Sequence, residues 1–223
     1  MNYLTNDQIL SVTELNKSKA LFRDVIEANT GYLIIKEDES NFRHRLIYNK
    51  LNEACLRLIG KSVRAGVDKR INGSSLALEK VLASELKKIG CIILGRSIAG
   101  YPDITFAING DNSNTICYVE VKSTGKKDPE DEKRRGFYAS GELKKIVDDG
   151  LHFSVAFKVT PITEVSDQFD SFNMIRKEGR FIINKYIIMD LYNFEVDLKC
   201  EWNAPTQELY GKRQNQLCRT TIF

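Results

Sequence analysis

The 223-residue sequence has few of the side chains on which many enzyme classes depend. Its only histidines are His44 and His152, which nearly excludes two-histidine metal sites and weakens any Ser-His-Asp or Cys-His mechanism. His44 lies between two arginines and His152 opens an apolar segment, so we expect an ordinary surface or edge position for both. Any catalysis is therefore expected to depend on carboxylates and lysines.

Five cysteines are present, an odd number, and no two of them form a CxxC pair. Zinc-binding and redox-active CxxC sites are therefore excluded. Four of the five cysteines adjoin an apolar residue, which is typical of reduced thiols used as small core side chains in a cytoplasmic protein. The sequence also lacks an apolar run of roughly 18 residues and a signal-peptide pattern, so we expect a protein that stays in the cytoplasm.

Neither sign of charge dominates the composition, because 33 Lys and Arg oppose 30 Asp and Glu, for a formal net charge of +3. A chain of this length buries roughly 70% of its unfolded surface, so a core forms without disulfides or metals. No repeat or linker divides the sequence, and we expect a single domain over residues 1–223. Within it we expect a helical N-terminal elaboration at 1–70, a core at 73–200 and a C-terminal extension at 201–223.

Apolar residues recur at helical spacing through the first 90 residues. This spacing predicts three helices, at about 9–26, 40–59 and 75–89. Gly60 and Gly90 are placed to end the second and third of these helices.

After Gly90 the apolar period changes from 3.6 to 2, which is typical of strands. One further helix is expected at about 139–147. The expected strands lie at 91–94, 103–108, 115–122, 153–159, 181–189 and 194–198. This order of elements, helices followed by a mostly antiparallel sheet with a crossover helix, predicts a fold of the broad α/β class. Within that class we expect an α+β arrangement with a mixed sheet.

The most informative segment is a predicted hairpin between 103–108 and 115–122. Residues 109–114 are nearly all turn formers, so Ile108 is expected to face Thr115. This register places Asp103 opposite Glu120, with β-carbons roughly 5 Å apart. Because side chains alternate along a strand, Glu120 and Lys122 share a face.

Two carboxylates at that separation repel each other unless a cation lies between them. A hard divalent ion such as Mg²⁺ prefers oxygen ligands and is typically held by one or two carboxylates together with waters and phosphate oxygens. Lys122 beside such an ion would contact a phosphate or a bound water. These groups are suited to phosphodiester hydrolysis.

Pro102-Asp103, sixteen intervening residues and Glu120-Val121-Lys122 resemble the PD-(D/E)XK signature of restriction-endonuclease-like nucleases. Gly73, Glu79 and Gly90 resemble the helix that precedes this signature in many members. The resemblance implies a restriction-endonuclease-like core with a helical N-terminal region. It also implies roles for side chains: Asp103, Glu120 and the Val121 carbonyl would hold Mg²⁺, Lys122 would position the attacking water, and Glu79 would assist through water.

Two questions stay open at this point. Glu85 lies nearer the middle of the apolar helix face than Glu79 and is the second choice for the auxiliary carboxylate. A structural role, in which Glu85 pairs with a basic side chain, suits it better.

The resemblance implies 5′-phosphate and 3′-hydroxyl product ends, but it covers several kinds of nuclease. Length and near-neutral charge are most like a type II restriction endonuclease that acts as a homodimer on double-stranded DNA, with a cognate DNA methyltransferase encoded nearby. The alternatives are a structure-specific repair or recombination nuclease and a non-catalytic DNA-binding module.

DNA contacts are expected from basic loops, because phosphate contacts position a protein on the duplex. Three stretches are candidates, within 61–70, 126–135 and 212–219. The residues that we expect to bind DNA are Lys126, Lys127, Arg134, Arg135, Lys69 and Arg70.

Overall fold

The structure is a computed structural model, and it describes residues 19–64, 72–96, 100–108, 115–125, 145–162 and 179–197. The chain divides into two compact units, Leu21–Phe194 and a terminal unit of Met1–Ala20 with Glu195–Phe223. At the terminal unit, β1 (Lys19–Leu21) pairs with β8 (Glu195–Asp197). The strand expected at 194–198 is thus confirmed as β8.

Three helices are described: α2 (Phe22–Thr30), α3 (Phe42–Leu56) and α4 (Asn72–Lys88). The side chain of Asn41 caps α3 by accepting a hydrogen bond from the Arg43 N–H at 2.9 Å. Gly60 and Gly90 follow the second and third helices with φ angles of 75° and 89°, a left-handed backbone that suits glycine. The second and third predicted helices are therefore confirmed, and α4 begins a few residues earlier than expected.

The first predicted helix, at 9–26, was misplaced in the part that the structure describes. Residues 19–21 form strand β1, and the helix runs on to Thr30. The Phe22 N–H donates to the Phe194 carbonyl oxygen at 2.7 Å. This pairing joins residues more than 170 positions apart, so the local apolar period contains no sign of it.

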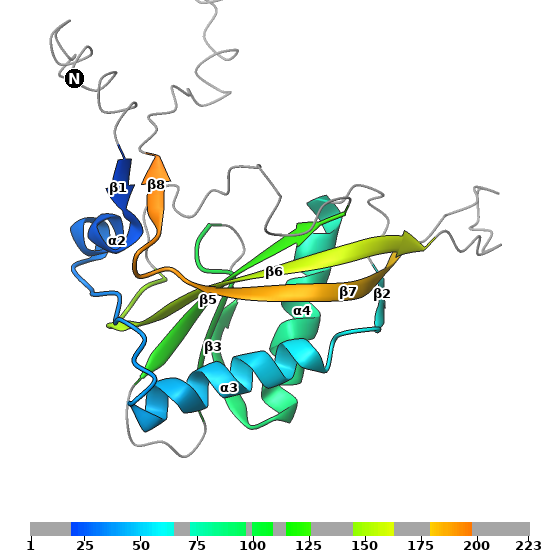
Figure 1. The fold of residues 1–223 in the computed structure, drawn as a ribbon, viewed down its shortest axis with the longest axis horizontal. Helices are drawn as coiled ribbons and strands as arrows, with labels where there is room; N and C mark the ends of the chain where they lie inside the picture. The colour runs from blue at the N-terminus through cyan, green and yellow to red at the C-terminus, as the bar shows by residue number, and fades with distance from the viewer. Residues whose placement is uncertain are drawn as a thin grey trace, which may run out of the picture. The chain divides into compact units, whose positions relative to one another are not determined.

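A six-stranded mixed sheet forms the centre of the larger unit (Figure 1). Its spatial order is β2-β7-β6-β5-β4-β3, and among these described strands only the β5–β6 pair is parallel. This arrangement confirms the predicted α+β mixed sheet. The strands are β2 (Ser62–Arg64), β3 (Cys91–Arg96), β4 (Ile104–Ile108), β5 (Ile116–Thr124), β6 (Gly150–Ile162) and β7 (Arg180–Asp190).

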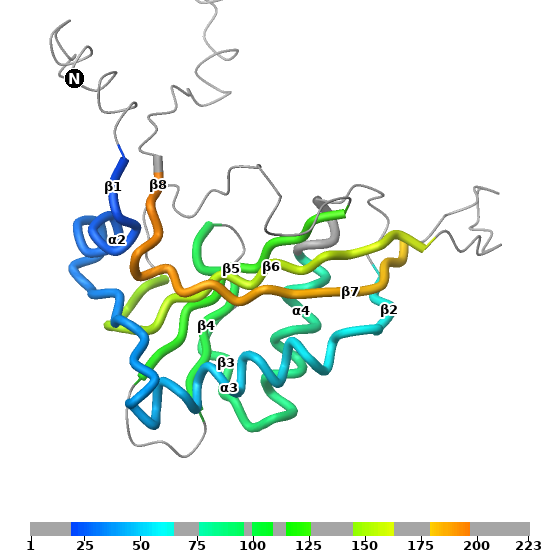
Figure 2. Tube along the Cα trace, viewed as in Figure 1, coloured from blue at the N-terminus to red at the C-terminus, as the bar shows by residue number. Residues whose placement is uncertain are grey.

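The parallel strands β5 and β6 lie side by side although a long segment separates them in sequence (Figure 2). A helix was expected in that segment, at 139–147. Residues 139–144 lie outside the described residues, and 145–147 are not helical. The described part of the crossover therefore offers no helix.

Helices α3 and α4 pack against one face of the sheet. Alternate residues of β5, namely Cys117, Val119 and Val121, join Leu51 of α3 and Leu82 of α4 in one buried cluster. The intervening β5 residues therefore point to the opposite face, as the period of two predicts. Glu120 and Lys122 are on that opposite face.

The expectation that both histidines lie at the surface or an edge is wrong. His152 is in the central strand β6 with 0% of its surface exposed, and His44 is buried on α3. Tyr118 of β5 is the register partner of His152 in the sheet. Burial lowers the pKa of His152 to about 3. The imidazole is therefore neutral at physiological pH and acts as a core side chain.

The cysteines that the structure describes are Cys55, Cys91 and Cys117, and all three are buried free thiols, as predicted. Burial raises the pKa of each thiol. Among the described residues, no helix is both long and apolar enough to cross a membrane.

Candidate active site

The predicted hairpin register is confirmed. Ile104 pairs with Val119, and the two following residues of β4 continue the same register. Asp103 directly precedes β4, and its N–H donates to the Val119 carbonyl oxygen at 3.0 Å. Asp103 is therefore opposite Glu120, as the turn-forming loop between the strands predicts.

The Asp103 carboxylate is held by the backbone of the neighbouring strand. Its Oδ2 accepts a hydrogen bond from the Val121 N–H at 2.8 Å. Burial raises the pKa of Asp103, while this hydrogen bond and the charge of Lys122 act in the opposite direction. The carboxyl group is thus fixed beside Glu120 and partly withdrawn from water.

Glu120 is 3% exposed although it carries an ionisable group. Its Oε1 forms an ion pair with Nζ of Lys122. Burial and the negative charge of Asp103 raise the pKa of Glu120 to about 8 in spite of Lys122. Its Oε2 is buried and has no hydrogen-bond partner within the described residues.

Glu79 of α4 interacts electrostatically with Asp103 and Lys122 of this cluster. Burial raises its pKa to about 7, with a further contribution from the charge of Asp103, while Lys122 and Lys145 oppose the shift. Asp103 therefore interacts electrostatically with two other carboxyl groups, those of Glu79 and Glu120.

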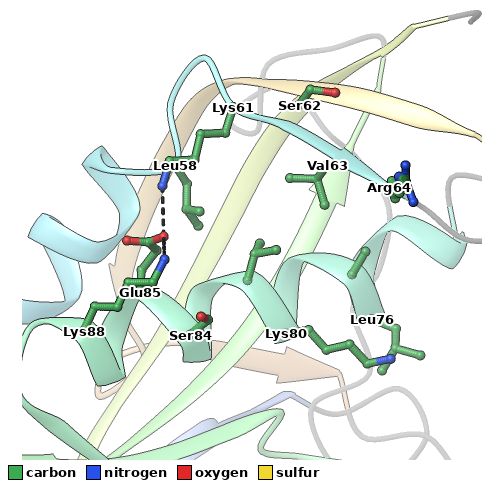
Figure 3. Close-up of a pocket in the computed structure, with 12 residues that line it drawn as sticks. Leu58, Lys61, Ser62, Val63, Arg64, Leu76, Lys80, Ser84, Glu85 and Lys88 are labelled. Carbon is green, nitrogen blue, oxygen red and sulfur yellow. Dashed lines mark hydrogen bonds and ion pairs between the residues drawn. The ribbon is translucent and has the colours of Figure 1, made fainter.

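Glu85, the second choice from the sequence, lies elsewhere on α4. Its Oε1 accepts hydrogen bonds from Lys61 and Lys88, both at 2.9 Å, and these two lysines lower its pKa. It borders a groove of about 600 Å³ between β2 and α4, also lined by Arg64 and Lys80 (Figure 3). Glu85 is therefore ion-paired with two lysines at this groove.

Lys145 is a site residue that sequence reasoning missed. Its Nζ donates to the Gly100 carbonyl oxygen at 2.7 Å. Burial lowers the pKa of Lys145, while the charges of Asp103, Glu120 and Glu79 raise it. No motif surrounds Lys145 in the sequence, so only the fold reveals its position beside the carboxyl groups.

Comparison with known families agrees with this chemistry. The family model for the type II restriction enzyme MjaV family matches residues 15–213, which is most of the sequence. The chain belongs to the MjaV family of type II restriction enzymes. It is therefore an endonuclease that binds double-stranded DNA, and the predicted resemblance to type II restriction endonucleases is confirmed.

Two other comparisons add little to the family assignment. No curated protein matches the sequence. The solved structure of the restriction endonuclease BglI bound to its DNA recognition sequence is similar, with 11% identity and a TM-score of 0.27. The match covers 82% of this chain and 90% of that one. A TM-score this low carries no weight for fold or function.

The donor set of this family member fits a hard divalent cation. Among the described residues, no three Asp, Glu, His or Cys side chains gather into a metal-binding group. Mg²⁺ requires fewer protein ligands, because it keeps several waters and is commonly held by one or two carboxylates. Glu120 lies opposite Asp103 in the hairpin, and its buried Oε2 has no hydrogen-bond partner among the described residues. Such an oxygen is stabilised by a cation.

The residues that we expected to bind DNA lie outside the described part of the enzyme. They are Lys126, Lys127, Arg134, Arg135, Lys69 and Arg70. Their contacts with DNA therefore stay a prediction.

Proposed function

We propose that this endonuclease is Mg²⁺-dependent and cuts DNA at the cluster of Asp103, Glu120 and Lys122. The observation that carries the proposal is the hairpin register, which brings two carboxyl groups together and leaves a buried carboxylate oxygen that no described residue hydrogen-bonds. Burying such an oxygen is costly unless a cation or a proton compensates it. A metal ion is the compensation that also serves phosphodiester hydrolysis.

The proposed ligands are the carboxylates of Asp103 and Glu120 and the carbonyl oxygen of Val121. A bound Mg²⁺ supplies Lewis acidity toward the phosphate and a more acidic water. The N–H of Val121 donates to Asp103, so the same peptide segment that offers its carbonyl also fixes the first carboxylate. The ligand set is thus preorganised by the pairing of β4 with β5.

The side chains around this set have separate proposed roles. Lys122 shares a strand face with Glu120, from where its ammonium can hold the attacking water and support charge on the phosphate. Glu79, whose pKa is raised to about 7, can take up a proton through a bridging water at neutral pH. Water attacks phosphorus, and the bond to the 3′ oxygen breaks. The products are a 5′-phosphate and, after protonation, a 3′-hydroxyl.

Further partners follow from the restriction function. We propose that two copies of the enzyme act as a homodimer on a short palindromic site, because the twofold symmetry of the duplex site then matches that of the protein. A DNA methyltransferase encoded nearby would protect the host genome, and the cytoplasm is the proposed place of action. Lys126, Lys127, Arg134, Arg135, Lys69 and Arg70 remain the proposed DNA contacts.

The test is cleavage of one plasmid by the purified enzyme under four metal conditions. Mg²⁺ or Mn²⁺ should give discrete bands, Ca²⁺ should support binding but little cleavage, and chelation should abolish cleavage. The Glu120→Gln variant should be inactive, while Glu27→Gln, a change at an exposed helix residue, should cut normally. Full cleavage after chelation would contradict the proposal, and smeared or branch-specific products would contradict its site-specific part.

A further inference from the structure

A second lysine, Lys145, interacts electrostatically with the carboxylate cluster and is bonded to the turn that precedes Asp103. Lys145 precedes β6, whereas Lys122 is on β5, so the two lysines come from different segments. The bond of 2.7 Å from its Nζ to the Gly100 carbonyl oxygen connects Lys145 to the turn that ends at Asp103. The position of this ammonium is therefore linked to the position of a proposed metal ligand.

The charges around Lys145 are those of the active site itself. Its charge interacts with the carboxyl groups of Asp103, Glu120 and Glu79. Lys122, the other lysine of the cluster, forms an ion pair with Oε1 of Glu120.

We propose that Lys145 is a further catalytic residue, which binds a non-bridging oxygen of the scissile phosphate while the Gly100 carbonyl fixes its position. This inference rests on the proposed function, because it needs the scissile phosphate at the Asp103–Glu120 pair. Negative charge on the phosphate oxygens has to be stabilised in the transition state, and a cation held in place by the fold does so without reorganisation.

The competing role for Lys145 is structural, namely holding the turn of Gly100 and Asp103. The two roles predict opposite changes in metal dependence. Removing a cation from beside the carboxylates strengthens their attraction for Mg²⁺, whereas loosening the turn misplaces Asp103 and weakens it. The Mg²⁺ concentration for half-maximal cleavage therefore separates the two roles.

The experiment measures single-turnover cleavage against Mg²⁺ concentration for the Lys145→Met, Lys145→Gln and Lys145→Arg variants of the full chain. We expect Lys145→Met to lower the rate at saturating Mg²⁺ by about 10²-fold, the effect of losing one electrostatic donor. Half-saturation should move to equal or lower Mg²⁺. Glutamine keeps a donor for Gly100 without the charge, so Lys145→Gln should lower the cleavage rate as much as Lys145→Met does. Lys145→Arg keeps the charge and should restore much of the rate.

Lys50→Met is the matched control. Lys50 donates to the Ile89 carbonyl oxygen at 2.9 Å, a bond of the same kind that involves none of the three carboxyl groups. This variant should cleave at the wild-type rate, and thermal melting should verify that all variants fold.

Three outcomes would overturn the inference. They are an unchanged rate in Lys145→Met, full rescue by glutamine, or a rate that recovers once Mg²⁺ is raised. Glu120→Gln, measured in parallel, separates this failure from a failure of the proposed function. If Glu120→Gln is inactive and Lys145→Met is not impaired, only the role of Lys145 is wrong. If both cleave normally, the proposed site itself is wrong.

Discussion

The hydroxyl oxygen of Tyr101 lies 2.6 Å from Nδ1 of His152 in the interior of the protein. Tyr101 stacks on His152 and meets Phe22 edge to face, with ring centroids 5.8 Å and 5.2 Å apart. The ring of Tyr118 lies on His152 at 4.6 Å. Because Tyr101 is two residues from Asp103, this buried pair joins the central strand β6 to the turn that carries a proposed metal ligand.

Removing the Tyr101 hydroxyl should destabilise the fold. Nε2 of His152 already has no hydrogen-bond partner among the described residues, and Tyr101→Phe would remove the partner of Nδ1 as well. Leaving a buried polar atom unsatisfied costs roughly 1–3 kcal/mol, which urea unfolding would measure. Tyr186→Phe is the control, because its hydroxyl bonds to Asn52 in a less buried setting and should cost less. Equal losses in both variants would contradict the prediction.

Stability without metal should depend on pH through Glu120. Its pKa of about 8 in the folded protein lies above the ordinary value of 4.5, so the folded state binds the proton more tightly than the unfolded state does. The free energy of unfolding should therefore fall as pH rises from about 4.5 to 8. Glu120→Gln cannot ionise and should be more stable than the wild type at pH 9, by a few kcal/mol at most.

The same pair of proteins gives a metal test. Mg²⁺ should raise the melting temperature of the wild type at pH 8–9, because a ligand that binds only the folded state stabilises it. Mg²⁺ should leave the melting temperature of Glu120→Gln almost unchanged, because this variant lacks one of the proposed metal ligands. A wild type whose stability is independent of pH, with the same response to Mg²⁺ as the variant, would show that Glu120 is not the buried ionisable ligand proposed here.

Lys122 should act on the rate of cleavage more than on DNA affinity. A lysine that only contacts the backbone would, when replaced by alanine, weaken binding and reduce its salt dependence by about one counterion. We expect Lys122→Ala to bind cognate DNA within about tenfold of the wild type, roughly 1.4 kcal/mol. Its single-turnover cleavage should fall by several orders of magnitude, because positioning of water is lost in the transition state. Titration and cleavage of one oligonucleotide decide between these roles.

Gly150 begins β6 where the strand passes close to β5. A β-carbon there would lie 2.6 Å from the Ile116 carbonyl oxygen and 2.7 Å from the Tyr118 ring. Gly150→Ala should therefore cost about 1–3 kcal/mol in unfolding free energy, because neither a paired backbone nor a buried ring can move away easily. Gly95→Ala is the control, since nothing lies within 4 Å of its added β-carbon, and it should change stability little. Similar stabilities of the two variants would show that β6 shifts without penalty.

Local sequence features determined the hairpin and hence the first half of the site. The loop at 109–114 consists almost entirely of turn formers, and the flanking strands alternate, so one register is favoured and Asp103 is opposite Glu120. The helix ends at Gly60 and Gly90 could also be predicted from the local sequence, because a left-handed backbone strongly favours glycine.

Only the tertiary structure decided the rest. Lys145 is far from Gly100 in sequence, and the parallel pairing of β5 with β6, which no local pattern encodes, brings it to the turn that leads to Asp103. His152 reads as an edge residue in the sequence but is buried, because β5 and β7 flank its strand on both sides. Glu79 and Glu85 belong to one helix, and the neighbours that the fold supplies, Asp103 for one and Lys61 for the other, give them different surroundings.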